Sequence, residues 1–174
     1  SINFLANTGN VAFPILSKLS SQGCKIDGYW ADDACIDENG KNLEATKINQ
    51  IKKDCNWQGL YFGGTAFKKQ RVISEDQYVN AAKYASKFMD VVTTSGVATG
   101  KEAKISKIRL FRSSIGDKPL ALASGITVDN AKNYSEVDCF MVATGINYDD
   151  NFYEIDAMKL SKLLNVCRQI GKGE

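Results

Sequence analysis

Three apolar runs in the second half of the chain end in a hydroxyl residue followed by glycine. They read DVVTTSG at residues 90–96, PLALASG at residues 119–125 and CFMVATG at residues 139–145. Each run follows a segment with helix-like spacing, a pattern typical of repeated βα units. A strand that ends in Ser-Gly or Thr-Gly presents backbone N–H groups and one hydroxyl, which suit a phosphate or another small anion. The repetition therefore predicts a site at the carboxyl ends of the strands.

The alternation of apolar runs and helical segments extends along the whole chain. Strands are expected at residues 2–6, 26–34, 58–65, 90–95, 119–124 and 139–144. Helices are expected at residues 11–19, 43–53, 78–88, 101–113, 130–135 and 156–170. The strands are almost continuously apolar, as in a parallel sheet covered on both faces. We therefore predict one α/β domain, residues 1–174, with six βα units and a parallel sheet, either TIM-barrel-like or doubly wound.

Composition argues against several classes of protein. The 22 basic and 20 acidic residues are interspersed and leave a net charge of +2, which argues against a nucleic-acid-binding surface. No apolar run approaches the roughly 20 residues of a membrane-spanning helix, and the N-terminus lacks a signal-peptide pattern. The five cysteines are scattered and never form C-x-x-C, which favours reduced thiols in a cytoplasmic protein.

The chain contains no histidine. This excludes Ser-His and Cys-His nucleophile systems, an imidazole general base and a His-ligated zinc site. Any chemistry must therefore use carboxylates, lysine, tyrosine, cysteine, hydroxyl groups, backbone dipoles or a hard metal ion.

Three segments resemble the last strand ends of the BtpA/SgcQ family: VVTTSGVATG (residues 91–100), PLALASGITVDN (residues 119–130) and FMVATGI (residues 140–146). The resemblance extends more loosely to residues 2–7, 27–33 and 60–68, which are similar to the family's third, fourth and fifth strands. It implies a TIM-barrel-like fold related to phosphate-binding barrels.

A complete barrel of this type has eight βα units, whereas this chain shows six. The two missing units would precede Ser1, an unusual start without methionine. The chain would then be a fragment or processed form, an open sheet, or a barrel closed by a partner. Because an open parallel sheet exposes unpaired edges, we expect either a homo-oligomer or a curled, half-closed barrel.

Two of the glycine turns follow the last two strands in the family comparison. Ser124-Gly125 and Thr144-Gly145 would then form the phosphate cradle that is common in this fold. The alternative is that each glycine only makes a tight turn between strand and helix.

The segment after the fourth predicted strand is rich in hydroxyl groups. Its candidate ligand-binding residues are Thr94, Ser95, Gly96 and Thr99. It is not a Walker P-loop, because the Gly-x-x-x-Gly-Lys spacing is one residue short and Glu102 follows the lysine. The alternative is a hydroxyl-rich loop that caps the next helix.

Three charged residues are candidate catalytic groups. Asp32 and Asp33 follow a strand, where a carboxylate can act as general base or hold Mg²⁺. Only one of the two should point inward, because adjacent strand residues face opposite ways; the alternative is a solvated acidic turn. Lys68 could bind an anionic substrate or form a Schiff base, or belong to a basic surface loop. The acidic surroundings of Cys35 should raise its thiol pKa, which argues against a nucleophile.

The leading functional hypothesis is binding of a small phosphorylated ligand, either a nucleotide or a sugar phosphate, at the strand ends. Carboxylate-assisted hydrolysis or lyase/isomerase chemistry is compatible with the absence of histidine. The alternative is a non-catalytic protein that binds or sequesters a ligand or assists complex assembly. The family resemblance supports this alternative, because one branch is associated with biogenesis of a photosynthetic complex.

Overall fold

The structure is a computed structural model that describes residues 1–5 and 7–171. Within these residues, five strands form one parallel sheet in the order β1-β2-β3-β4-β5. The strands are β1 (Gly28–Ala31), β2 (Leu60–Gly64), β3 (Val91–Ser95), β4 (Leu120–Ala123) and β5 (Cys139–Met141). Consecutive strands are neighbours throughout, and every pair is parallel. The predicted parallel α/β class is confirmed.

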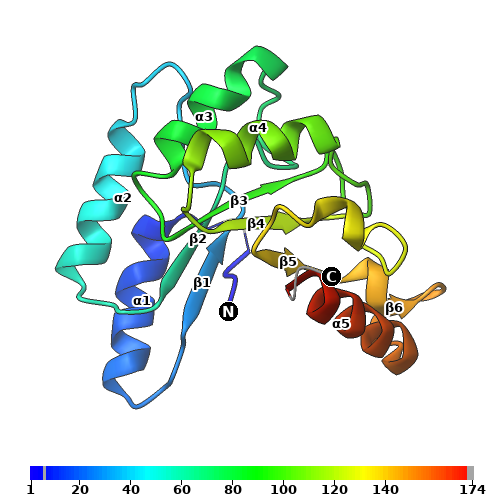
Figure 1. The fold of residues 1–174 in the computed structure, drawn as a ribbon. Helices are drawn as coiled ribbons and strands as arrows, with labels where there is room; N and C mark the ends of the chain where they lie inside the picture. Colours follow the sequence, from blue (N-terminus) through cyan, green and yellow to red (C-terminus); the bar gives the residue numbers. More distant parts are fainter. Residues whose placement is uncertain (6, 172–174) are drawn as a thin grey trace.

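Helices connect the strands along the outer side of the sheet (Figure 1). They are α1 (Gly9–Ser21), α2 (Leu43–Asp54), α3 (Tyr78–Ala85), α4 (Ile105–Ile115) and α5 (Ala157–Gly171). Short 3₁₀ helices lie at η1 (Glu75–Gln77), η2 (Ala131–Tyr134) and η3 (Thr144–Ile146). The first four α-helices pack in pairs, α1 on α2 and α3 on α4, while α5 packs against η2 and η3. None of the helices in the described part of the chain is long and apolar enough to cross a membrane.

The first predicted strand, residues 2–6, is reduced to one residue. Ile2 forms a single parallel bridge with Tyr29, and Ala6 lies outside the described residues. The side chain of Asn3 explains why pairing stops: its Oδ1 accepts a hydrogen bond from the Leu5 amide at 2.6 Å, while its Nδ2 donates to the Trp30 carbonyl at 2.9 Å. An Asn side chain that bonds two residues ahead makes a turn in place of a strand.

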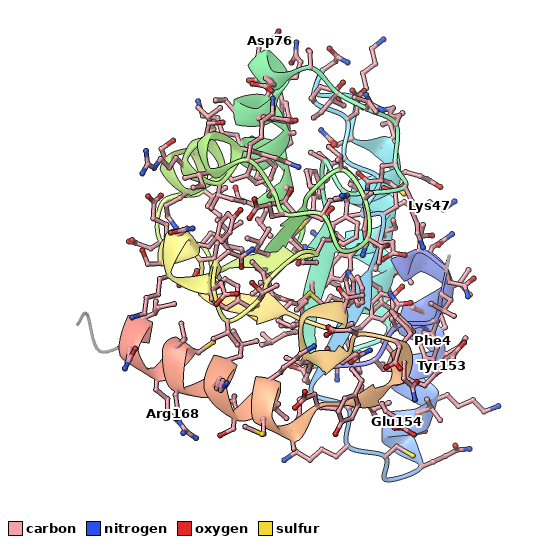
Figure 2. The ribbon with its side chains drawn as sticks, turned by 90° about the vertical axis from the view of Figure 1, so that its right-hand side faces the viewer. Phe4, Lys47, Asp76, Tyr153, Glu154 and Arg168 are labelled. Atoms are coloured by element: carbon pink, nitrogen blue, oxygen red, sulfur yellow. The ribbon has the colours of Figure 1, made fainter. Side chains whose placement is uncertain are left out.

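Three further differences concern the last third of the chain. The helix predicted at residues 130–135 is the 3₁₀ helix η2, and the strand predicted at residues 139–144 ends at Met141. An unpredicted antiparallel hairpin, β6 (Asn147–Tyr148) with β7 (Asn151–Ile155), precedes α5. Tyr153, which is 93% exposed, projects from this hairpin beside Glu154 (Figure 2).

Aromatic side chains divide between the two faces of the sheet. Tyr29 and Tyr61 stack with ring centroids 5.9 Å apart, and Phe13 of α1 meets both rings edge-on. All three side chains are buried, so this cluster holds α1 against the outer face. Trp30 and Phe62 follow these tyrosines and pair with each other in register. Because side chains alternate along a strand, both lie on the inner face.

The ends of the first strands are staggered, which curls the sheet. Ala31 ends β1 and pairs with Gly63, so β2 continues one residue further, to Gly64. Gly64 pairs with Thr93, so β3 continues two residues further, to Ser95. A stagger of this kind accompanies strand tilt in barrels. The sheet is therefore a half-barrel with helices outside, and the doubly wound alternative is wrong.

Candidate functional site

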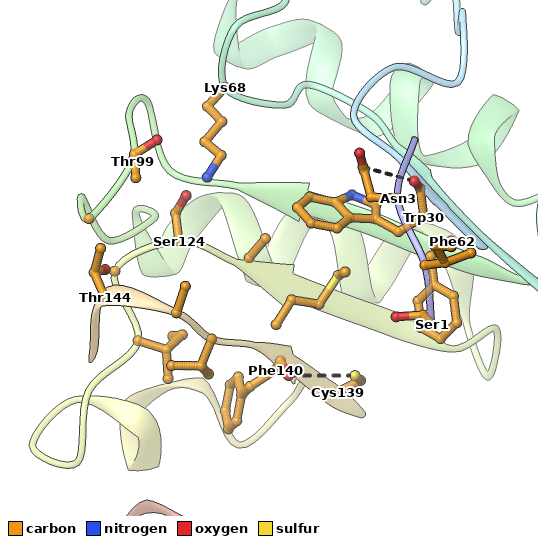
Figure 3. Close-up of a pocket in the computed structure, with 18 residues that line it drawn as sticks. Ser1, Asn3, Trp30, Phe62, Lys68, Thr99, Ser124, Cys139, Phe140 and Thr144 are labelled. Atoms are coloured by element: carbon orange, nitrogen blue, oxygen red, sulfur yellow. Dashed lines mark hydrogen bonds between the residues drawn. The ribbon is translucent and has the colours of Figure 1, made fainter. Parts of the chain in front are cut away.

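A cavity of about 470 Å³ lies along the inner face of the half-barrel and reaches the carboxyl ends of β4 and β5 (Figure 3). Its wall includes five of the predicted site residues: Lys68, Thr99, Ser124, Gly125 and Thr144. The volume falls within the range of small-molecule sites. The structure thus brings together side chains from three separate loops, those after β2, β3 and β4, and the start of η3.

Ser124 is the most unusual residue of this wall. It is 9% exposed, and its Oγ is buried without a hydrogen-bond partner in the part of the chain that the structure describes. Its φ of 75° lies in the left-handed region, which a serine adopts at a cost of about 1–2 kcal/mol. Figure 3 shows the Ser124 hydroxyl and the Lys68 ammonium pointing toward one another. Strain and an unpaired polar group at one residue are features that accompany functional sites.

The glycines after β3, β4 and β5 let the loops pack backbone against backbone. A Cβ on Gly125 would collide with the main chain of Lys101 and Glu102, and a Cβ on Gly96 with the carbonyl oxygens of the same two residues. A Cβ on Gly145 would collide with the carbonyl of Ile126. Gly96 and Gly145 do not line the cavity. Close packing therefore accounts for these two glycines, whereas Gly125 both packs closely and lines the cavity.

Lys68 lies in the loop after β2 and is partly buried. Its backbone N–H donates a hydrogen bond of 2.7 Å to the Ser95 Oγ, which fixes where the side chain begins. Burial lowers the pKa of the Lys68 ammonium, Lys69 adds to that effect, and the carboxylate of Asp32 opposes it. A partly desolvated ammonium of this kind is suited to holding an anion.

Thr94 and Ser95, two other predicted ligand residues, are fully buried and face other parts of the protein. The Thr94 Oγ1 is 3.4 Å from the carbonyl of Ala66. The Ser95 Oγ donates to the carbonyl of Gly96 at 2.8 Å as well as accepting from Lys68. Neither residue lines the cavity. Their hydroxyl groups instead join the loops after β2 and β3.

Asp32 and Asp33 lie just after β1 and differ in their surroundings. The Asp33 Oδ1 accepts hydrogen bonds from the Cys35 amide at 2.8 Å and from Gln70 Nε2 at 3.1 Å. Asp33 lines a second cavity, of about 630 Å³, between the loops after β1 and β2. Asp32 acts electrostatically on Lys68. Neither carboxylate lines the inner cavity. Asp32 is the one that influences it, through its charge effect on Lys68.

The thiol of Cys35 has its pKa raised to about 11, as expected for a residue that is not a nucleophile. Burial is the largest cause, followed by the charges of Asp33 and Glu44. Among residues 1–5 and 7–171, no group of three or more His, Cys, Asp or Glu side chains could hold a metal ion. The side chains around Asp32 therefore do not form a cage for Mg²⁺.

Sequence reasoning missed three residues that shape the site: Trp30, Gln70 and Lys107. Trp30 lines the cavity, and Gln70 Nε2 donates to the carbonyls of Asp32 and Gly64 at 2.8 and 3.1 Å. Lys107 is 7% exposed and has its pKa lowered to about 8 by burial. The sequence could have indicated this burial, because Lys107 stands four residues before Phe111 and so shares the apolar face of the predicted helix.

No protein-family model and no curated protein matches this chain. Among solved structures, phosphoribosyl anthranilate isomerase from Thermus thermophilus is similar, with a TM-score of 0.51 and 10% sequence identity. The match covers 90% of this chain and 80% of the isomerase chain. Since the isomerase has a TIM-barrel-type fold, the likeness confirms a partial TIM-barrel-like α/β fold. At this identity, the likeness concerns the fold alone.

Proposed function

We propose that the protein binds a small phosphorylated ligand in the inner cavity, at the carboxyl ends of β2, β4 and β5. The Ser124 hydroxyl is the observation that carries the proposal. It is buried, strained and unpaired among the described residues, and it lies on the same wall as the Lys68 ammonium. A phosphate oxygen would accept the hydrogen bond that Ser124 lacks and would neutralise Lys68.

The other groups on this wall fit the same ligand. Thr99 and Thr144 add hydroxyl donors, and Gly125 adds main-chain polar groups at a turn with a φ of 67°. Apart from Ser1 and Asn3, the side chains along the rest of the cavity are apolar, which strengthens electrostatic attraction to an anion. A nucleotide and a sugar phosphate both supply the required phosphate.

Catalysis on such a ligand would depend on Asp32 as the general base, with hydrolysis or lyase/isomerase chemistry as the reaction class. The resemblance to the BtpA/SgcQ family supports a phosphate-binding barrel and also supports the second candidate, a non-catalytic ligand-binding or assembly protein. The position of both Asp32 and Asp33 off the cavity wall favours the second candidate.

Assembly into a homo-oligomer in the cytoplasm is part of the same proposal. Its support is a set of exposed apolar side chains on the β6–β7 hairpin, which includes Phe152, Tyr153 and Ile155. The five cysteines, all within the described residues, are free thiols, as in reducing compartments. Light scattering of the purified protein would measure the oligomeric state.

Calorimetric titration with inorganic phosphate and ribose 5-phosphate tests the binding proposal. Lys68→Met should lower the affinity for both by roughly tenfold or more, because a charge-assisted hydrogen bond is lost. Lys69→Met is the matched control: Lys69 is exposed, does not line the inner cavity, and should change affinity less than about twofold. Equal effects of the two substitutions would contradict a site at Lys68.

Mass spectrometry distinguishes an enzyme from a binding protein. A phosphorylated compound that co-purifies and stays unchanged on incubation supports non-catalytic binding, whereas its conversion supports catalysis. Repeating the incubation with the Asp32→Asn variant tests whether Asp32 is the general base. Conversion at the wild-type rate would exclude Asp32 from that role.

A further inference from the structure

We infer that the phosphorylated ligand carries a planar aromatic ring, which stacks on the indole of Trp30. This inference rests on the proposed phosphate site and specifies the rest of the ligand. The cavity is divided by its chemistry. Lys68, Thr99, Ser124 and Thr144 gather at one end, whereas Trp30, Phe62 and Met141 contribute an apolar wall along the inner face. Ser1 and Asn3 lie beside Phe62 and Trp30 (Figure 3).

Trp30 is held as a rigid platform. Its carbonyl accepts a hydrogen bond of 2.9 Å from Asn3 Nδ2, and its amide donates to the Ile2 carbonyl at 2.9 Å. The ring of Phe67 meets the indole edge-on, with centroids 6.0 Å apart. Backbone and ring are thus both fixed while the side chain remains part of the cavity wall. A fixed aromatic ring binds a planar group at low entropic cost.

The apolar wall discriminates between the two ligand classes that carry a phosphate. Ser1 and Asn3 also line this part of the cavity, but the Asn3 side chain is already bonded to the Trp30 carbonyl and the Leu5 amide. A sugar phosphate that extended along Phe62 and Met141 would therefore find few free hydrogen-bond partners for its hydroxyl groups, which is unfavourable. An aromatic ring buries apolar surface there instead.

The indole Nε1 is buried and, among residues 1–5 and 7–171, has no hydrogen-bond partner. Its N–H lies in the plane of the indole, so a ring stacked on the indole face does not accept from it, and the inference rests on the part of Trp30 that lines the cavity. A nucleotide-like compound combines the two features that the cavity offers to recognise, a phosphate at the polar end and a planar ring against Trp30.

A single-tryptophan protein makes this stacking measurable. Trp57 is the other tryptophan, is 5% exposed and packs against Phe13 in the core beside α1, away from the cavity. In the Trp57→Phe variant, fluorescence reports on Trp30 alone. Inorganic phosphate, ribose 5-phosphate and adenosine 5′-monophosphate serve as probes, with affinities measured by calorimetry on the same protein.

Adenosine monophosphate should bind about tenfold more tightly than ribose 5-phosphate and should quench Trp30 fluorescence. In Trp30→Leu, the advantage of the adenine compound should fall below twofold, and Trp30→Phe should restore part of it. Circular dichroism verifies that each variant is folded, and the Trp30→Phe protein keeps the test decisive if Trp30→Leu does not fold.

The possible results distinguish failure of the aromatic-ligand inference from failure of the phosphate-site proposal. Equal affinity for ribose 5-phosphate and adenosine monophosphate, with Lys68→Met still weakening both, would overturn the aromatic ligand and leave phosphate binding in place. Binding of none of the three probes would overturn both.

Discussion

The Lys107 ammonium donates a hydrogen bond of 2.8 Å to the backbone carbonyl of Ser95. The side-chain Oγ of the same Ser95 accepts a hydrogen bond of 2.7 Å from the backbone N–H of Lys68. A second hydrogen bond, of 2.6 Å, joins Lys107 to the carbonyl of Ala66. The ammonium also lies 5.1 Å from the centre of the Tyr78 ring. A buried lysine behind the sheet therefore connects the end of β3 to the loop that presents Lys68 to the cavity.

Lys107 should make stability depend on pH in the alkaline range. Burial lowers its native pKa from 10.5 to about 8, so between these values the unfolded chain holds a proton that the native protein has lost. Unfolding then takes up a proton, and the free energy of unfolding rises with pH across this window. The rise attributable to Lys107 is at most roughly 3 kcal/mol.

Denaturant unfolding of the wild type and of Lys107→Met, measured from pH 7 to pH 10.5, tests this expectation. The difference between the two curves isolates Lys107 from Cys35, whose raised pKa acts in the opposite direction above pH 9. The wild type should gain stability relative to the variant as pH rises. A constant difference would show that Lys107 titrates as an ordinary lysine.

Asp32→Asn should shift the pH range over which phosphate binds. The Asp32 carboxylate raises the pKa of Lys68 against the lowering effect of burial. Its removal should therefore lower that pKa further, and phosphate affinity should be lost at a lower pH than in the wild type. Calorimetric titrations at a series of pH values provide the measurement.

Asp33→Asn is the matched control for that shift. The Asp33 side chain bonds to Cys35 and Gln70 and is not among the charges that act on Lys68. Its substitution should leave the midpoint unchanged. The assignment of Asp32 as the electrostatic partner fails if both variants shift the midpoint equally.

Gly125→Ala should destabilise the protein because of collision as well as backbone strain. Gly125 has a φ of 67°, and a Cβ there would strike the main chain of Lys101 and Glu102. Gly23 has a φ of 87° with open space around it, so Gly23→Ala measures strain alone, about 1–2 kcal/mol. Thermal and denaturant unfolding should show an additional loss of roughly 2 kcal/mol or more for Gly125→Ala. An equal loss of stability in Gly125→Ala and Gly23→Ala would mean that the segment at Lys101 and Glu102 moves away from position 125 at little cost.

The sequence was sufficient to predict the βα order, because continuous apolar runs and helical spacing are local patterns. It also predicted the gathering of Lys68, Ser124 and Thr144, because parallel strands bring their carboxyl ends to one rim. It failed where a non-local partner decides the structure. Residues 2–6 look like a strand, but the Asn3 side chain is held by the distant Trp30 carbonyl and turns the chain after Ile2 by bonding to the Leu5 amide.

The buried and exposed faces of α4 illustrate the same limit. Helical spacing groups Ile105 with the buried residues Ile108 and Phe111, yet Ile105 is 39% exposed while Lys107 is buried. Two backbone carbonyls and two aromatic rings surround the lysine, and none of these partners is visible from sequence spacing. The unpaired state of Ser124 and the inner position of Trp30 likewise depend on how the sheet curls.

Ser124→Ala should make the protein more stable and weaken its binding of phosphate. The substitution removes a buried hydroxyl that has no partner among the described residues, which should raise the free energy of unfolding by about 1 kcal/mol. Ser95→Ala is the matched comparison: its hydroxyl accepts from Lys68 and donates to Gly96, so its loss should cost about 1–2 kcal/mol. Denaturant unfolding and phosphate calorimetry on both variants supply the measurements. A destabilised Ser124→Ala protein would indicate that the hydroxyl is already satisfied in the free protein, which would remove the main support for a phosphate at this position.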